Sequence, residues 1–209
     1  LKTVPVVGVA LGSCVGLGAI KVVSSHFSVL VNDQAQVMAA GPHVVRQAYG
    51  VEIDKNDLGG HKVQRKNAVV HNEAKDEADA LMQVQKFLSY MPRSIHHLAP
   101  VTSCTDSPSR ADDWLKDAIP KDRRQIFDPR KILKSVFDLD SVFEIGRYQG
   151  GSVITALARL NGYPVGVIIN DPKVQGGAMT VQAAYKMERH VKMCSQFGLP
   201  IVNLVDLPG

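Results

Sequence analysis

The sequence predicts an α/β fold arranged in two units, and three observations point to it. An apolar strand-like run, a helical pattern and a second apolar run follow one another within residues 4–31. Similar segments return around a hairpin signal within residues 143–205. Between them, residues 100–130 are rich in Ser, Pro, Asp, Lys and Arg, which is typical of a linker. With 209 residues, 45% of them hydrophobic, the chain is long enough for one large domain or parts of two.

The first unit begins with a strand, a helix and a second strand. The apolar run at residues 4–11 predicts the first strand, and a helix begins near Gly16. Residues 27–31 predict the second strand, and a short helix is expected over residues 42–49. This order is typical of a βαβ unit.

A longer helix, expected over residues 73–90, closes the first unit. Pro92 would stop it, and apolar residues recur along it at helical spacing: Ala74, Ala78, Leu81, Val84 and Leu88. In the linker, a short helix is expected around Trp114, and the segment FDPRKIL leads into another helix.

The second unit is expected to contain a hairpin followed by a helix and a further strand. The predicted strands are, in order, residues 143–145, 153–160, 163–169 and 201–205. Asn161 and Gly162 form the strongest short hairpin signal, so the two strands that flank them should be antiparallel. Thr180 can cap a helix that ends before Gly198.

A glycine-rich turn, GSCVGLGAI at residues 12–20, separates the first predicted strand from its helix. Such a turn can aim backbone N–H groups outward beside the positive end of a helix dipole, where an oxygen that gains negative charge is stabilised. Lys21 stands where the last glycine of a Rossmann fingerprint should be, and no GKS or GKT follows. The alternative is a tight turn whose glycines only allow close packing of helix on strand.

A second set of small residues, Gly176, Gly177 and Ala178, lies in the loop of residues 170–179, just before the next predicted helix. It offers a second candidate set of exposed amides. The alternative is a capped loop, in which the glycines only supply turn conformations. Two such loops in two α/β units are more specific than either one alone.

Composition and spacing argue against several function classes. The net charge of +4 comes from mixed patches without aromatic interleaving, which disfavours nucleic-acid binding. No apolar run approaches the roughly 20 residues that cross a bilayer. The three cysteines lack CxxC spacing, which disfavours a disulfide framework or a metal site and fits a reducing compartment, the cytoplasm or the mitochondrial matrix. No Ser/His/Asp order, GxSxG elbow or HExxH helix is present. The first residue, Leu1, and the end on DLPG suggest a fragment.

Several motifs, in order, resemble the carboxyltransferase family of biotin-dependent acyl-CoA carboxylases, of the acetyl- and propionyl-CoA type. In the first unit they are GSCVGLGAI, MAAGPHVVRQAYGVEI, DLGGHKV and HNEAKDEADAL. In the rest of the chain they are DPRKIL, ALARLNGYPVGVIIND, QGGAM and LPIVNLVDLPG. The resemblance implies a crotonase-like (ClpP/crotonase) βαβ superhelix and parts of two tandem domains. Residues 1–97 would be the later part of the acyl-CoA domain, 98–130 the linker, and 131–209 the earlier part of the biotin domain.

The resemblance implies a carboxyl transfer from carboxybiotin, held on a carrier, to the α-carbon of an acyl-CoA. Negative charge would develop on the thioester oxygen and on the biotin ring oxygen, so backbone donors in a dry site are the suitable catalysts. The implied partners are acyl-CoA, a biotin carboxylase and a biotin carrier, in a homo-oligomer that is a hexamer for the full-length protein. No lysine lies in an AMKM pattern, so biotin would be attached elsewhere.

Roles for individual residues also follow from the resemblance. Leu17 and Gly18 would donate their N–H groups on the thioester side, with Gly16 as the hinge of the turn. On the biotin side, Gly177 and Ala178 would be the donors, and Gly176 would give the loop its conformational freedom. Lys173 either pairs with the carboxylate being transferred or is simply solvated.

Three other functions stay open at this point. A decarboxylase or transcarboxylase subunit would use the same fold for loss or exchange of the carboxyl group. A non-catalytic assembly subunit would keep the fold, although the retained glycines argue against it. A crotonase-type hydratase is disfavoured because no pair of glutamates follows the glycine turn. The text LVDLPG resembles the propionyl- and acetyl-type enzymes more than the methylcrotonyl type.

Overall fold

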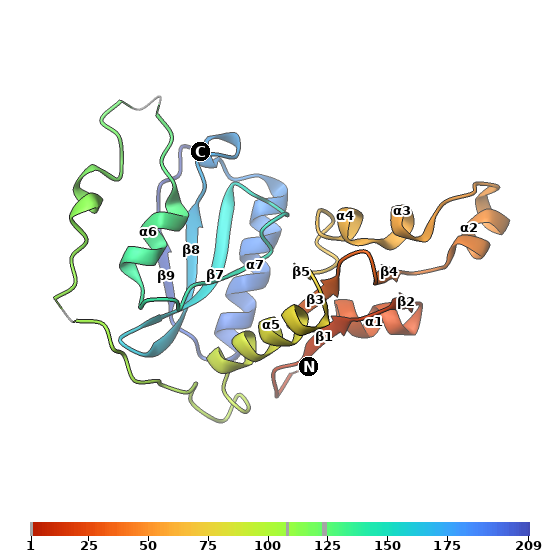
Figure 1. Cartoon of the computed structure of the whole chain (residues 1–209), viewed down its shortest axis with the longest axis horizontal. Helices are drawn as coiled ribbons and strands as arrows, with labels where there is room; N and C mark the ends of the chain where they lie inside the picture. The colour runs from red at the N-terminus through yellow and green to blue at the C-terminus, as the bar shows by residue number, and fades with distance from the viewer. Residues whose placement is uncertain (1, 108, 123–124) are drawn as a thin grey trace. The chain divides into compact units, whose positions relative to one another are not determined.

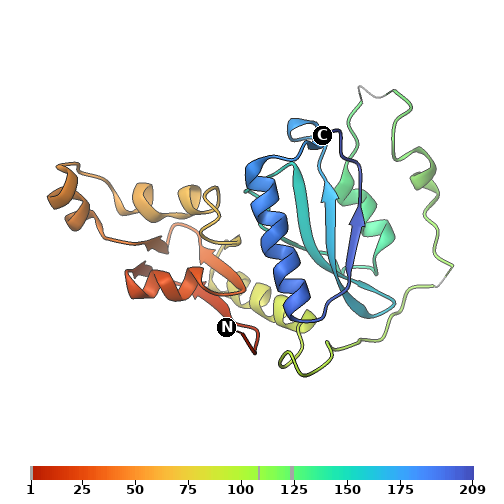
Figure 2. The same cartoon turned by 180° about the vertical axis from the view of Figure 1, so that it is seen from behind.

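The computed structural model describes residues 2–107, 109–122 and 125–209, and the chain forms two compact units, residues 1–88 and 89–209 (Figures 1 and 2). Both units combine helices with β-sheet, so the predicted α/β class is confirmed. Residues 98–130 belong to the second unit. Among the described residues, no helix has the length and hydropathy needed to cross a membrane.

Two small parallel sheets form the first unit. β1 (Val7–Ala10), β3 (Phe27–Val31) and β5 (Asn72–Ala74) make a three-stranded sheet with β3 in the centre. β2 (Ser13–Val15) and β4 (Gln36–Met38) pair separately, also in parallel. The strand predicted at residues 4–11 is therefore shorter than expected, and residues 13–15, predicted to lie in the glycine turn, form a second short strand. Three-residue strands such as β2 and β4 carry too little pattern to be detected from sequence.

Five helices belong to this part of the chain: α1 (Leu17–Val23), α2 (Pro42–Tyr49), α3 (Lys55–Gly59), α4 (His61–Gln64) and α5 (Glu77–Tyr90). The predicted bounds of α2 are confirmed. α3 was not predicted, but it starts where Asp54 accepts a hydrogen bond from the backbone N–H of Asn56, at 2.8 Å. This is an ordinary side-chain N-cap.

The helix expected over residues 73–90 is wrong at its start and in its buried face. Glu73 and Ala74 lie in β5, where Ala74 pairs with Val31 of β3 and is buried. Leu81 and Leu88, expected on the apolar face, are exposed. The buried residues of α5 are Ala80, Phe87 and Tyr90. Packing against β3 outweighs the longer run of apolar spacing, because Phe87 stacks on Phe27 with ring centroids 4.8 Å apart.

Close packing fixes α1 on β1. A Cβ atom added to Gly8 would lie 2.8 Å from both the Cα and the carbonyl oxygen of Val22, so only glycine fits here. Just beyond α1, the hydroxyl of Ser25 donates within 2.7 Å of the carbonyl oxygens of Val22 and Phe27. The backbone of α1 is thereby held against the first sheet.

The second unit contains a four-stranded sheet with the order β6–β7–β8–β9. Its strands are β6 (Phe143–Ile145), β7 (Val153–Leu160), β8 (Tyr163–Asn170) and β9 (Ile201–Leu204). β7 and β8 form the predicted antiparallel hairpin, and Asn161 and Gly162 have positive φ angles of 49° and 82°. β8 and β9 are parallel and joined through a helix. The strand positions predicted for this unit are confirmed.

Helices cover both faces of this sheet (Figures 1 and 2). α6 (Pro129–Val136) packs on one face through Leu133, beside the buried Phe137, and α7 (Val181–Gln196) packs on the other face through Ala183. The predicted cap of α7 is confirmed, because Thr180 Oγ1 accepts a hydrogen bond from the N–H of Ala183 at 3.1 Å. Two short 3-10 helices complete the unit: η1 (Asp113–Asp117) and η2 (Gln175–Gly177).

Candidate active site

The glycine turn of the first unit is built by Gly16, which links β2 to α1. Gly16 has φ 56° and ψ −117°, a conformation that residues with a Cβ avoid. Its N–H donates to the carbonyl oxygen of Met38 at 3.2 Å, and its own carbonyl accepts the N–H of Ile20 at 3.0 Å. The turn is thus fixed to β4 and forms the first hydrogen bond of α1.

The two predicted donors, Leu17 and Gly18, are the first residues of α1. N–H groups in the first turn of a helix have no acceptor inside that helix. Neither N–H has a hydrogen-bond acceptor among the described residues, and the φ angle of Leu17 is not positive. Leu17 as a whole residue is 67% exposed. Both amides are free to bind an oxygen atom.

A pocket of about 280 Å³ opens beside this turn. Its lining is mostly apolar and includes residues of α1, β4 and α4: Gly16, Ala19, Ile20, Val23, Val37, Met38, Ala39, Gln64 and Val69. The amide of Gln64 donates to the carbonyl oxygen of Val37, so this polar group is already satisfied. The pocket therefore suits an apolar group next to the free amides.

The glycine loop of the second unit is closed by its own hydrogen bonds. Gln175, Gly176 and Gly177 all have positive φ angles, of 50°, 63° and 80°. The N–H of Gly177 donates to the carbonyl oxygen of Val174 at 3.0 Å, and the N–H of Ala178 donates to that of Gln175 at 3.1 Å. Both predicted donors on this side thus have acceptors within the loop.

Lys173 forms an ion pair with Asp128, with Nζ 2.8 Å from Oδ2. Asp128 is the N-cap of α6, and its carboxylate also accepts the backbone N–H of Arg130 at 3.0 Å. The hydrogen bond from Lys173 lowers the pKa of Asp128, with the neighbouring backbone and charges adding to the effect. The structure therefore gives Lys173 a protein partner, which neither sequence interpretation anticipated.

An ionic network around Arg130 escaped the sequence analysis. The guanidinium of Arg130 donates to both oxygens of Glu144, at 2.8 and 2.6 Å, and to Oδ2 of Asp171 at 2.6 Å. Lys186 of α7 is buried nearby and donates to the carbonyl oxygen of Gly146 at 3.2 Å. Burial lowers the pKa of Lys186 to about 8. No spacing rule links these residues, because Arg130 and Asp171 alone are 41 positions apart in the chain.

His190 and Cys194 form a Cys/His pair that the sequence analysis did not find, although their i, i+4 spacing on a helix was a signal. Cys194 Sγ lies 3.7 Å from His190 Nε2, and both residues are buried. Burial lowers the pKa of His190 to about 4 and raises that of Cys194 to about 12. The pair is therefore a neutral imidazole beside a thiol, a packing contact under Gly166 rather than an activated nucleophile.

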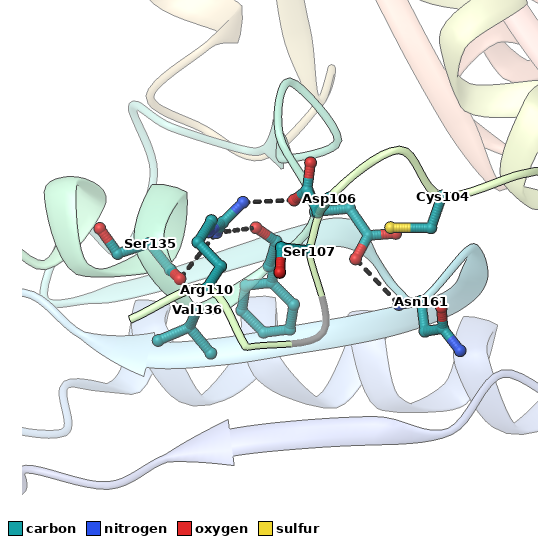
Figure 3. Close-up of a pocket in the computed structure, with 9 residues that line it drawn as sticks. Cys104, Asp106, Ser107, Arg110, Ser135, Val136 and Asn161 are labelled. Carbon is teal, nitrogen blue, oxygen red and sulfur yellow. Dashed lines mark hydrogen bonds and ion pairs between the residues drawn. The ribbon is translucent and has the colours of Figure 1, made fainter. Parts of the chain in front are cut away.

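A pocket of about 320 Å³ in the second unit brings Cys104, Asp106 and Asp138 together (Figure 3). Its charged groups are engaged in structural contacts. Asp106 pairs with Arg110, whose guanidinium also donates to the carbonyl oxygens of Lys134, Ser135 and Phe137 at the end of α6. Asp138 accepts the N–H groups of the hairpin residues Asn161 and Gly162, at 2.8 and 2.7 Å. These contacts tie Asp106 and Arg110 to the end of α6, and the turn between β7 and β8 to Asp138.

Comparison with known proteins places this geometry in a family. A model described as "Carboxyl transferase domain" matches residues 2–209. The chain is 30% identical over 207 residues to the methylmalonyl-CoA decarboxylase subunit alpha of Veillonella parvula, covering 99% of this chain and 41% of that protein. It is also 30% identical to the mitochondrial propionyl-CoA carboxylase beta chain of Homo sapiens, covering 99% and 38%. The chain thus spans about two fifths of the length of these relatives.

Solved structures agree. A crystal structure of transcarboxylase 12S, described as a hexamer with hydrolyzed methylmalonyl-coenzyme A bound, matches with a TM-score of 0.94 and 27% identity, covering 100% of this chain and 41% of that one. A single-chain, multi-domain long-chain acyl-CoA carboxylase matches with a TM-score of 0.83 and 28% identity, covering 98% and 20%. The crotonase-like fold implied by the sequence motifs is confirmed. Through both of its units, this chain belongs to the carboxyl transferase domain family.

Proposed function

We propose that this chain forms part of the site of a biotin-dependent carboxyltransferase that moves a carboxyl group between carboxybiotin and the α-carbon of an acyl-CoA. The observation that carries the proposal is the match of the whole chain, through both glycine-rich segments, to the carboxyl transferase domain family. The likeness to a transcarboxylase described with hydrolyzed methylmalonyl-coenzyme A bound supports an acyl-CoA substrate.

On the acyl-CoA side, we assign the thioester oxygen to the N–H groups of Leu17 and Gly18. Abstraction of the α-proton moves negative charge onto that oxygen, and two fixed amides at a helix start stabilise the charge without reorganisation. Gly16 sets the direction of both amides through its positive φ angle. The adjoining pocket of about 280 Å³ would receive the short apolar part of the acyl group.

On the biotin side, we assign the donors to Gly177 and Ala178, with Gly176 supplying the turn. Carboxybiotin would enter as a substrate on a carrier and would supply the carboxyl group and the nitrogen that takes the α-proton. Because both N–H groups now donate within the loop, they would bind a ring oxygen either by sharing their hydrogen atoms or by opening the 3-10 turn. Positive φ angles at Gly176 and Gly177 permit such a change of the backbone.

For the protein as a whole, we propose the partners and setting that the family implies. These are a biotin carboxylase, a biotin carrier and a homo-oligomeric, hexameric assembly like the one named for transcarboxylase 12S. The absence of CxxC spacing favours the cytoplasm or the mitochondrial matrix. A mitochondrial relative from Homo sapiens agrees with the second.

The relatives favour two directions for the reaction. Likeness to propionyl-CoA carboxylase beta chains supports carboxylation of a short acyl-CoA. Likeness to a methylmalonyl-CoA decarboxylase subunit, at the same identity, supports loss of the carboxyl group as the second candidate function. Both directions use the same two amide sites, so the proposed roles of the residues hold for either one.

The test is an assay of the full-length protein with methylmalonyl-CoA or malonyl-CoA and free biocytin. We expect biocytin-dependent release of the decarboxylated acyl-CoA, with a rate that ranks the acyl chains. A folded, assembled protein that releases nothing from any carboxylated acyl-CoA would instead support a non-catalytic assembly subunit.

A further inference from the structure

The start of α6 and the loop of residues 170–179 are joined by two ion pairs. Arg130 donates from Nη1 to Asp171 Oδ2 at 2.6 Å, and Lys173 Nζ lies 2.8 Å from Asp128 Oδ2. Asp128 and Arg130 stand two residues apart at the start of the helix, and Asp171 and Lys173 stand two residues apart in the loop. The helix start supplies the cation of one pair, Arg130, and the anion of the other, Asp128. The loop supplies the opposite charge in each case.

Arg130 is itself fixed by a third contact. Its Nε and Nη2 donate to the two oxygens of Glu144 in β6, a bidentate pair of defined orientation. The side chain of Asp171 is only 3% exposed, and that of Arg130 is 26% exposed. A charge-assisted hydrogen bond in such surroundings is stronger than one on the surface, and a partner left alone there is costly.

Asp171 passes this restraint to the loop. Its Oδ1 accepts the N–H of Lys173 at 3.1 Å, and its carbonyl oxygen accepts the N–H of Val174 at 3.1 Å. The adjacent Asn170 donates from Nδ2 to the carbonyl oxygen of Gly177 at 3.0 Å. Asn170 at the end of β8 and Asp171 at the start of the loop therefore together hold Lys173, Val174 and Gly177.

We propose that Arg130 is a positioning residue that, through Asp171, holds the loop of residues 170–179 in place for the biotin-side half of the reaction. The proposal rests on the proposed function, because it takes that loop as the biotin side. Arg130 contacts no reacting atom in this account. It acts by holding Asp171 beside Glu144 of β6, and so fixes the start of the loop whose later part carries the amides of Gly177 and Ala178.

Because of the neighbouring charges, a substitution of Asp171 tests the proposal more cleanly than removal of Arg130. Lys186 of α7 feels both Glu144 and Asp171, which favour its charged form, and Arg130, which opposes it. Removal of Arg130 would leave two carboxylates with one fewer cation, whereas Asp171→Asn keeps the shape and removes only the charge. Asp171→Asn is therefore the main test. Arg130→Lys, which keeps the positive charge but loses the bidentate guanidinium, is the second variant.

The experiment uses the full-length protein and steady-state kinetics of biocytin-dependent decarboxylation of methylmalonyl-CoA. For Asp171→Asn and Arg130→Lys we expect the KM for biocytin to rise, or kcat to fall, by about tenfold or more, because small misplacement of donors is costly. The KM for methylmalonyl-CoA should stay within about twofold, since Leu17 and Gly18 lie in the other unit. Lys192→Gln is the matched control, because Lys192 forms an exposed i, i+4 pair with Glu188 on α7.

Each outcome decides one claim. No biocytin-dependent turnover by the unsubstituted protein contradicts the proposed function itself. Turnover by the unsubstituted protein with unchanged biocytin kinetics in both variants overturns the positioning role. An equal rise in the KM for biocytin and in the KM for methylmalonyl-CoA also overturns it, because it indicates general destabilisation. If a variant is unstable, amide hydrogen exchange of residues 170–179 in the other variant decides: faster exchange there, and unchanged exchange in α7, supports the role, and no change overturns it.

Discussion

The two glycine-rich segments solve the same local problem in different ways. In the first unit, Gly16 and the close contact of Gly8 with Val22 hold α1 by backbone packing, and the amides of Leu17 and Gly18 are left free. In the second unit, the loop amides are consumed by internal hydrogen bonds, and ion pairs to α6 hold the loop. Under the proposed function, the difference indicates a preformed site for the acyl-CoA and, for biotin, a loop that is held at its start while its amides must change hydrogen-bond partners to bind.

Substitution of Gly16 should give the largest effect and separate the two segments. Gly16→Ala forces a Cβ into a φ, ψ region that suits only glycine, so the first turn of α1 must move. We expect kcat/KM for methylmalonyl-CoA to fall about a hundredfold, as for loss of an oxyanion donor. Gly176 has a left-handed helical conformation with open space around it, so Gly176→Ala should lower this kcat/KM by about fivefold or less. Steady-state kinetics of both full-length variants, with Gly50→Ala as a control for strain at positive φ, measures this.

Replacement of Gly8 should show that the first unit, with its glycine turn, depends on backbone packing. In Gly8→Ala the new Cβ would lie 2.8 Å from backbone atoms of Val22, so α1 must separate from β1. The free energy of unfolding should fall by about 2–3 kcal/mol, measured by urea denaturation. Gly12→Ala, which has nothing within 4 Å of its added Cβ, should change it far less. Equal effects would show that close packing does not distinguish Gly8.

The second unit should respond to pH through His190. Burial lowers the pKa of His190 to about 4, below its ordinary value near 6.5, so the unfolded chain binds more protons between these values. Stability should be fully present above about pH 6.5 and be lost as pH falls toward 4, by about 3 kcal/mol. Unfolding of the unsubstituted protein and of His190→Gln, measured from pH 7 to pH 4.5, tests this. A pH slope retained in His190→Gln would assign it to other groups.

Lys173 is the exposed residue of the two ion pairs that join α6 to the loop of residues 170–179, and its removal should have the smallest effect on stability. The side chain of Lys173 is 46% exposed, so Lys173→Gln should lower the free energy of unfolding by less than about 1 kcal/mol. The same change should raise the pKa of Asp128 toward its ordinary value, because the hydrogen bond from Lys173 is the largest cause that lowers it. NMR titration of the Asp128 carboxyl measures this; an unchanged pKa would show that α6 alone sets it.

Much of the fold could be predicted where local signals agree with packing. Asn161-Gly162 and Thr180 each specify a turn or a cap by their own chemistry, and both features are present in the structure. The start of α5 could not be predicted, because Glu73 and Ala74 fit a helical pattern until pairing with β3 is known. Tertiary contacts decided that segment, as they decided which face of α5 is buried.

The candidate site, like the fold, could be predicted only in part. The glycine positions Gly16, Gly176 and Gly177 are visible in sequence, because a positive φ angle requires a particular residue type. That the amides of Gly177 and Ala178 are occupied is not visible, since it depends on the exact path of the loop. The contact of Arg130 with Asp171 is equally hidden, because ion pairs between distant residues have no sequence period.

The most direct test of a preformed acyl-CoA side and an adjustable biotin side is a crossed kinetic measurement on the full-length protein. Biocytin-dependent decarboxylation of methylmalonyl-CoA would be followed in Gly16→Ala and in Asp171→Asn, with each substrate varied in turn. We predict that Gly16→Ala impairs methylmalonyl-CoA kinetics and that Asp171→Asn impairs biocytin kinetics, each leaving the KM of the other substrate within about twofold. An equal rise in the KM of both substrates in either variant would contradict the division of the site.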